Sequence, residues 1–263
     1  MRLKLLAALA VVLSACAGET GPAGPQGPPG KDGAPGKDSP VPPVAQVAYN
    51  SMPDTLPYAV SSHSFEGQGT SQFGEAVTLA PNTGRQLVRV TVLMSNYGET
   101  PAYAWPMTLN IYAPSDLTHP IAALTQVVNV PARPESNPGA CNGNPQWLDP
   151  NGACHYSLAF PVVFDLSATL PDTLVYGIAY DTQSNGGPHQ TGTSGDYNNL
   201  NVGYIAAAPS VGQRGDLYAT ITPSYDTGGG TYTTPTPGVY SVATPVNPAD
   251  APLRPVVKFE VMP

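Results

Sequence analysis

Serine, cysteine and histidine side chains carry much of the nucleophilic and metal chemistry in proteins, and this 263-residue chain arranges few of them for it. Nucleophilic catalysis needs a serine or cysteine beside a histidine and a carboxylate. The sequence contains neither a Gly-x-Ser-x-Gly turn nor a closely spaced pair of histidines. The four histidines are His63, His119, His155 and His189. We therefore predict a protein that is not an enzyme and that carries no cofactor.

Carboxylates offer a second kind of chemistry, because two of them suffice for glycoside hydrolysis. Such carboxylates pair in space rather than at a fixed spacing. The sequence singles out no pair among its 18 Asp and Glu residues. An extracellular glycan-binding or glycan-hydrolysing protein is therefore kept as the alternative function.

A third pattern with chemical meaning lies at the start of the chain and ends in a cysteine. Two positive charges precede an apolar run of eight residues, 5–12, which is too short to span a bilayer and is typical of a signal peptide. The next four residues, Leu13-Ser14-Ala15-Cys16, resemble the lipobox of bacterial lipoproteins. The resemblance implies cleavage before Cys16, which would then carry acyl chains on its thiol and its amine and anchor the protein stably in a membrane. A plain secretory cleavage site is the alternative.

A strict glycine period follows Cys16. Glycine occupies every third position from Gly18 to Gly36, in seven triplets that end at Asp38. This pattern is that of collagen, in which only glycine fits at the axis where three polyproline II chains meet. Fully extended, the 21 residues reach on the order of 65 Å. Two arrangements stay open: a triple helix that makes the protein a homotrimer, and a single-chain spacer.

Charge and composition limit the classes of partner that the chain is expected to bind. The full chain has a net charge of −8, and removal of a leader containing Arg2 and Lys4 leaves −10. An acidic chain with ten unclustered Lys and Arg residues is a poor candidate for binding nucleic acid. We predict an exported protein held in the bacterial envelope by its lipid. In the lipoproteins that this motif resembles, an Asp after the cysteine is associated with inner-membrane retention in didermal bacteria. For an envelope of that type, Ala17 predicts the outer membrane or the cell surface.

The rest of the chain predicts β-strands rather than helices. Short runs of alternating apolar and polar residues are separated by turns rich in Gly and Pro. The expected strands are 44–49, 61–67, 75–79, 87–94, 107–112, 121–130, 156–166, 174–180, 200–205, 217–221 and 256–261. In the clearest strand, we expect Val88, Val90, Val92 and Met94 to share one face. Pro161 predicts an edge, a bulge or a break in its strand.

These strands predict an all-β fold with a single β-sandwich or jelly-roll-like domain. The organisation would be a lipoprotein signal peptide in 1–15, then the lipidated cysteine, the collagen-like stalk and a proline-rich hinge in 16–43. The head would occupy 44–263. Residues 223–254 are expected to form a loop-like excursion before a last strand.

Cys141 and Cys154 remain once Cys16 is assigned to the lipid. An even pair of cysteines in an exported protein favours a disulfide. A pair of buried free thiols and a zinc site are the alternatives. Four zinc ligands are not in sight, and we predict no metal centre.

Two weaker ligand sites deserve testing. Asp181, Asn185 and Asp196 supply hard oxygen atoms near a glycine turn, as calcium prefers, although the bidentate glutamate of a calcium loop is missing. Trp105 and Trp147 are candidates for stacking against sugars. As the alternative, Trp147 would simply cover the disulfide, and Tyr176 and Tyr180 have the spacing of core residues.

The order of motifs after residue 60 resembles a group of exported bacterial β-sandwich domains without assigned activity. The motifs are Thr108-Leu109-Asn110-Ile111-Tyr112, Leu170-Pro171-Asp172-Thr173 and Tyr176-Gly177-Ile178-Ala179-Tyr180. The resemblance covers about residues 60–262 and implies a fold and an extracellular location, without catalytic residues. Together with the stalk, it predicts a collagen-like surface lipoprotein whose head serves adhesion, ligand binding or envelope structure, with a glycan or a surface protein as the partner.

Overall fold

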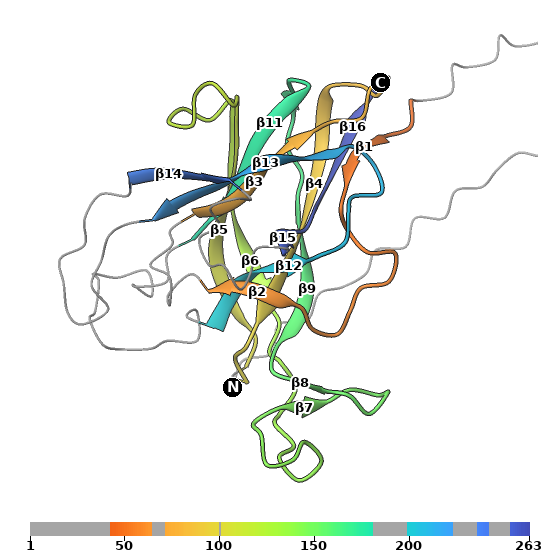
Figure 1. Cartoon of the computed structure of the whole chain (residues 1–263), viewed down its shortest axis with the longest axis vertical. Helices are drawn as coiled ribbons and strands as arrows, with labels where there is room; N and C mark the ends of the chain where they lie inside the picture. The colour runs from red at the N-terminus through yellow and green to blue at the C-terminus, as the bar shows by residue number, and fades with distance from the viewer. Residues whose placement is uncertain (1–42, 65–71, 100, 181–198, 223–235, 242–252) are drawn as a thin grey trace, which may run out of the picture. The chain divides into compact units, whose positions relative to one another are not determined.

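The computed structural model describes residues 43–64, 72–99, 101–180, 199–222, 236–241 and 253–263. The chain divides into two units, Met1–Val41 and Pro42–Pro263, and the head is the second of them. The leader, Cys16 and the glycine period lie outside the described residues. Every helix or strand assigned within the described ranges is a β-strand, so the predicted all-β fold is confirmed (Figure 1).

The larger of the two main sheets has eight strands. Its order is β1-β16-β4-β12-β15, with β9 and β10 also paired to β4 and with β2 paired to β12. Every pairing in it is antiparallel. The strands are β1 (Gln46–Asn50), β2 (Ser61–Ser64), β4 (Gln86–Asn96), β9 (Leu158–Phe164), β10 (Ala168–Thr169), β12 (Leu200–Ile205), β15 (Arg254–Pro255) and β16 (Val257–Met262).

The smaller sheet has six antiparallel strands in the order β14-β13-β3-β11-β5-β6. They are β3 (Gln72–Thr78), β5 (Tyr103–Tyr112), β6 (Ala122–Val130), β11 (Thr173–Ala179), β13 (Gln213–Thr222) and β14 (Thr236–Ser241). β14 corrects the prediction of a loop throughout 223–254. It is held by six paired positions along β13, so its structure depends on a neighbouring strand that the local sequence pattern does not reveal.

The inner faces of the two sheets form the core, which confirms the predicted β-sandwich. Met107, Leu109 and Ile111 of β5 and Tyr176 and Ile178 of β11 alternate into it and are almost completely buried. Apolar side chains on the larger sheet pack against them. On one side the sheets approach each other, where the Gln126 side chain of β6 donates a hydrogen bond to the Val163 carbonyl of β9 at 2.7 Å.

One strand departs from the predicted alternation. Val90, Val92 and Met94 of β4 lie in the core as expected, but Leu87 lies there in place of Val88. The register with β16 shifts at this point, from Glu260 opposite Arg89 to Val261 opposite Leu87. The bulge inserts one extra residue into β4 between Leu87 and Val90. The core-facing positions are therefore even-numbered from Val90 onward, whereas before the bulge the core-facing residue is Leu87.

Pro161 and Pro106 lie inside strands at positions where the ladder tolerates them. Pro161 of β9 lies opposite Leu93, and among the described strands β9 pairs only with β4, so the edge position, one of the three predicted possibilities, is confirmed. Pro106 of β5 lies opposite Val127 of β6, beyond the stretch of β5 that pairs with β11. At each of these two positions only one neighbouring strand is paired, and the ladder tolerates the missing amide hydrogen of a proline there.

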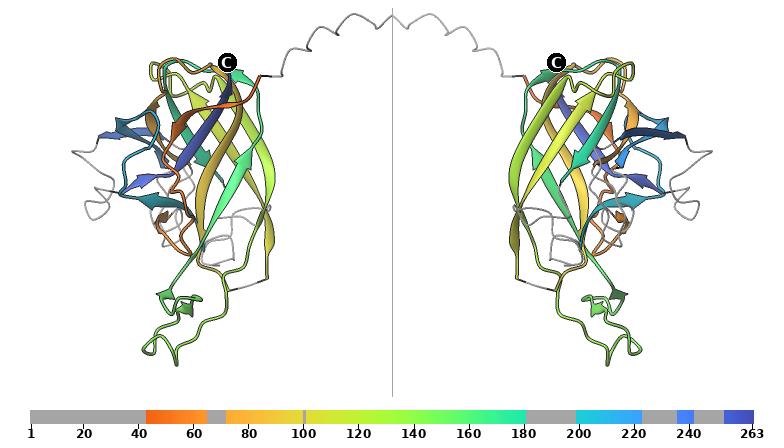
Figure 2. Two further views of the ribbon diagram at one scale, coloured as in Figure 1. Left: turned by 90° about the vertical axis from the view of Figure 1, so that its right-hand side faces the viewer. Right: turned by 90° about the vertical axis from the view of Figure 1, so that its left-hand side faces the viewer.

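β4 defines two ends of the head. At the first end, Gln86 pairs with Met262 of β16, and Gln46 at the start of β1 pairs with the preceding residue of β16. At the second end, Asn96 pairs with Leu158 at the start of β9. The eleven residues of β4 separate these ends by roughly 35 Å. We call the first end the entry pole, because the chain enters the head there, and the second the distal pole; Figure 2 shows them at opposite ends.

Candidate functional site

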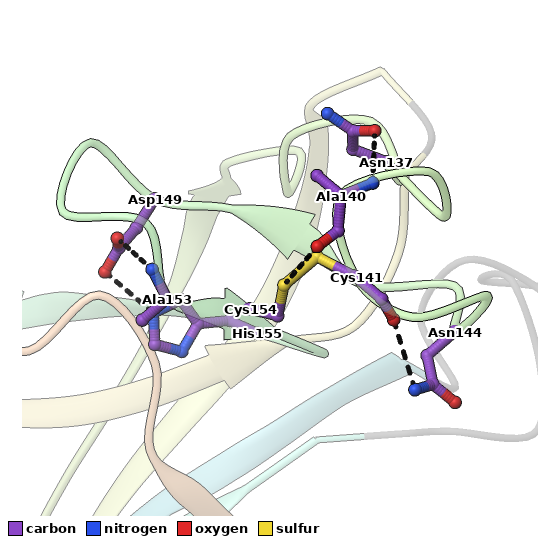
Figure 3. The surroundings of a disulfide bond; sticks show 8 residues. All are labelled: Asn137, Ala140, Cys141, Asn144, Asp149, Ala153, Cys154 and His155. Carbon is purple, nitrogen blue, oxygen red and sulfur yellow. Dashed lines mark hydrogen bonds and ion pairs between the residues drawn. A yellow bond between two sulfur atoms is a disulfide. The ribbon is translucent and has the colours of Figure 1, made fainter.

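The connection from β6 to β9 forms a separate lobe at the distal pole, at the opposite end of the head from the C-terminus (Figure 2). We call residues 131–157 the disulfide lobe. Its two-stranded hairpin consists of β7 (Trp147–Leu148) and β8 (Cys154–His155). Cys141 and Cys154 are joined by a disulfide with Cα atoms 5.8 Å apart, which confirms the predicted pair (Figure 3).

Asp149 folds the tight turn of this hairpin. Its Oδ1 accepts the backbone amides of Asn151 at 2.8 Å and Ala153 at 2.9 Å. Gly152 takes a φ of 85°, which an L side chain rarely adopts. The sequence Asp149-Pro150-Asn151-Gly152 thus specifies the turn locally, and the turn brings β8 back along β7.

An aromatic cluster joins the lobe to the loop before β2. The Trp147 ring lies 5.2 Å from His155 and 6.0 Å from Tyr58, between ring centroids, and Tyr58 lies 6.3 Å from His155. The Trp147 indole donates a hydrogen bond to the Ser157 carbonyl at 2.9 Å. The Tyr58 carbonyl accepts the Ala159 amide at 2.9 Å. These contacts fix the three rings as one unit, which we call the ring cluster (Tyr58, Trp147 and His155).

His155 and Asp149 form the main charged contact of the lobe. The His155 Nε2 lies 2.9 Å from the Asp149 Oδ2, as Figure 3 shows. This hydrogen bond lowers the pKa of Asp149, and the amides of Ala153 and Asn151 lower it further. Asp149 is therefore ionised at neutral pH and accepts, so His155 donates from Nε2 and keeps Nδ1 for another partner.

Arg133 attaches the lobe to the sandwich. Its side chain is almost entirely buried, and Nε donates to the Tyr97 carbonyl at 2.9 Å. Its Nη2 contacts Glu99 and Ser136, and its backbone amide bonds to the Gly98 carbonyl at 2.9 Å. The guanidinium offers five N–H donors in a fixed planar fork, whereas the ammonium of a lysine offers three on a flexible stem.

The surface of the lobe is polar but nearly uncharged. Sixteen residues of 131–157 are exposed, and Glu135 is the one charged residue among them. The exposed set includes four asparagines: Asn137, Asn142, Asn144 and Asn151. Of the eight exposed large apolar residues in the described part of the chain, four lie in the lobe or in the loop that contacts it: Leu56, Tyr58, Leu148 and Tyr156.

A second cluster of charged groups lies inside the sandwich. Glu75 of β3 is completely buried and contacts Arg254 of β15 at 2.8 Å, Arg214 of β13 at 3.8 Å, and the hydroxyl of Tyr49 in β1 at 3.3 Å. Burial raises the pKa of Glu75 to about 7, although Arg254 and Arg214 act in the opposite direction. Because no part of Glu75 reaches solvent, we interpret this buried charge cluster as a clamp between the two sheets rather than as a binding site.

The described residues offer little else for chemistry. Among them, no group of three or more His, Cys, Asp and Glu side chains is placed to hold a metal ion. Within the same ranges, no helix has the length and apolar character needed to cross a membrane. No family model, no curated protein and no solved structure matches this chain. The only indications of what the disulfide lobe does therefore come from its own side chains.

The structure separates the predicted ligand residues. Trp105 and Trp147 are 5% and 4% exposed, so neither presents an open face for a sugar. Trp105 packs in the main core, and Trp147 forms the base of the ring cluster. The calcium candidates Asp181, Asn185 and Asp196 lie outside the described residues, as do His189 and the lipidation candidate Cys16. Of the other two histidines, His119 bonds to Asp116 in an exposed turn, and His63 lies in β2 opposite Val202.

Three important residues were not singled out from the sequence. Glu75 had a usable signal, because it alternates with the core residues Phe73 and Val77 and so falls on an apolar face. Tyr58 and Arg133 had none, since they lie in irregular segments and contact residues of the sandwich and the lobe that are distant in sequence. Such contacts emerge only when the lobe, the loop and the sandwich come together.

Proposed function

We propose that this chain is a lipid-anchored cell-surface protein that displays a non-enzymatic β-sandwich head on a collagen-like stalk. The sequence from Leu13 to Cys16 supports the lipid anchor, and the glycine period supports the stalk. The Cys141–Cys154 disulfide suits an oxidising, extracytoplasmic location. The head would serve adhesion or ligand capture.

The observation that carries this proposal is the placement of the lobe relative to the point where the chain enters the head. The stalk would connect through Pro42 and Pro43 to β1, which begins at the entry pole. The disulfide lobe extends from the distal pole (Figure 1). A tether at one pole leaves the other free, so the lobe is the part of the head best placed to meet a partner.

Labelling with radioactive palmitate in the cells that make the protein tests the anchor. We expect the wild-type chain to incorporate label and to sediment with membranes. A Cys16→Ser variant should lose both properties, and the neighbouring Ala17→Ser control should keep both. An unlabelled wild-type chain would overturn the proposal.

Surface display has a separate test. An antibody raised against residues 137–155, with the disulfide formed, should label intact cells that carry the wild-type protein. Labelling that requires prior permeabilisation of the cells would contradict display of the lobe.

Glycan hydrolysis, the competing function, is not favoured by the buried carboxylates. Of the described residues, Glu75 and Asp149 are the buried acids. Glu75 is held by arginines, and Asp149 by His155 and two backbone amides. A screen of the complete protein against polysaccharides measures this directly, and steady release of reducing ends would establish an enzyme.

A further inference from the structure

We infer that the disulfide lobe binds a neutral, hydroxyl-rich carbohydrate at the exposed side of the ring cluster formed by Tyr58 and His155. This inference rests on the proposed display of the head and adds the class of ligand and the residues that contact it. Four properties of the lobe favour such a ligand: exposed rings, rigidity, available hydrogen-bonding groups and a lack of exposed positive charge.

Tyr58 provides the ring face. Its side chain is 42% exposed, while the Trp147 ring behind it is buried at 4%. The two rings meet edge to face, with an interplanar angle of 87°. An exposed aromatic ring backed by a buried one can pack against the C–H face of a sugar while its hydroxyl hydrogen-bonds at the rim.

The cluster is rigid before any ligand arrives. The Tyr58 backbone is fixed by the Ala159 amide, and the His155 ring is fixed by Asp149. The disulfide closes the loop that carries Trp147 and Asp149. Side chains that are already ordered lose little conformational freedom when they bind, which favours a weakly interacting ligand such as a sugar.

Hydrogen-bonding groups for sugar hydroxyls lie in the lobe. In neutral His155, donation from Nε2 to Asp149 makes Nδ1 an acceptor for a hydroxyl proton. The Asp149 carboxylate already accepts hydrogen bonds from His155 and from two backbone amides, so we do not expect it to bind the ligand. The exposed Asn151 amide lies in the same turn and can both donate and accept.

The charge and size of the lobe decide between ligand classes. An acidic glycan or a nucleic acid would call for exposed Lys or Arg, and among the exposed residues of 131–157 there is none. A specific protein partner typically covers about 20–30 residues on each side. The lobe exposes sixteen, and Asp54, Thr55, Leu56 and Tyr58 of the loop before β2 bring the total to twenty, the lower limit of that range. The absence of exposed positive charge favours a neutral glycan chain.

Binding of the complete mature protein to an array of neutral glycans tests the inference, followed by retardation in gels that contain the neutral polysaccharides recognised. We expect retardation by at least one neutral polysaccharide and none by polygalacturonate, an acidic one. Tyr58→Ala should weaken binding by roughly tenfold or more, because the stacking face is lost. Tyr58→Phe keeps the ring and should retain most of the binding.

Tyr156→Ala is the matched control. Tyr156 is 48% exposed in the same lobe, yet it makes no ring contact within the described residues, so its loss should leave binding unchanged. His155→Ala replaces the Tyr58 variant as the deciding measurement if Tyr58→Ala fails to fold, and it too should weaken binding.

Three results would overturn the inference: no binding to any neutral glycan, binding to the acidic polysaccharide alone, or neutral binding that survives both Tyr58→Ala and His155→Ala. Palmitate labelling and antibody labelling of cells are measured independently of glycans. A protein that is anchored and displayed but binds no glycan therefore refutes the ligand class and leaves the display proposal standing.

Discussion

Glu75 is a carboxylate placed where an apolar side chain would be expected, between the core residues Phe73 and Val77. Its contacts reach β1 and β15 of the larger sheet and β13 of its own sheet. Within the buried charge cluster, the Tyr176 hydroxyl and the Arg214 Nε and Nη2 atoms lack hydrogen-bond partners. Burial therefore outweighs the attraction of the arginines and favours the protonated acid.

This balance predicts how stability depends on pH. The folded-state pKa of Glu75 is raised from 4.5 to about 7, so between these pH values the folded protein holds a proton that the unfolded chain releases. The free energy of unfolding should then fall as pH rises through this interval, by up to about 3 kcal/mol. A Glu75→Gln variant has no such proton, so the wild type should lose stability relative to it. Urea unfolding at pH 4.5, 6 and 8 measures the difference.

The opposite trend would contradict this prediction. If the wild type gained stability over Glu75→Gln as pH rises, the arginines would outweigh burial and the pKa of Glu75 would be lowered. Glu260→Gln on β16 is a suitable control, since Glu260 is a partly exposed strand residue paired with Lys258 and lies outside the buried charge cluster.

At the scale of elements, some strands were predictable from the local sequence pattern, whereas other features depend on contacts with distant parts of the chain. The strands with clear alternation, such as β5 and β11, were predictable because a half-buried strand reveals its inner face every second residue. The disulfide followed from the pairing of two cysteines. β14 and the position of the bulge in β4 were not predictable, because both depend on the register with a neighbouring strand. The ring cluster likewise depends on a loop far from it in sequence.

The disulfide lobe should behave as an element with its own stability. Removing the disulfide by Cys141→Ala and Cys154→Ala frees a loop with a sequence separation of 13, and the chain-entropy model gives a cost of about 3 kcal/mol. Hydrogen exchange should quicken at the Asp149 and Ala153 amides, while β4 keeps its protection. Glu135→Gln, at an exposed position of the same lobe, serves as the control.

Equal loss of protection in the lobe and in β4 would contradict this prediction. It would mean that the lobe and the sandwich unfold as one cooperative unit. The Arg133 contacts with Tyr97 and Glu99 would then be strong enough to couple them.

At the scale of the whole molecule, the proposal places a small recognition element on a long tether. One such site binds weakly, but three sites on a trimer gain avidity without new contacts. The glycine period offers a route to such a trimer, because a triple helix would hold three heads together.

We expect residues 17–263 to form a concentration-dependent trimer in sedimentation, and the same chain without 18–38 to be a monomer. Gly27→Ala should shift the stalked chain toward monomer, since a side chain does not fit at the axis of the triple helix. Gln26→Ala, one position earlier, should leave the trimer intact. A trimer that persists without 18–38 would assign assembly to the head, and a monomeric stalked chain would make the repeat a spacer.

The position of the two poles also has a mechanical consequence. A pull between Gln46 and the disulfide lobe would act along β1, β16, β4 and β9, which lie side by side and antiparallel. Hydrogen bonds in antiparallel sheets run across the strands, so this load would shear many of them at once instead of opening them one after another. We therefore expect the head to resist extension along the tether, a property that would suit the proposed role in adhesion.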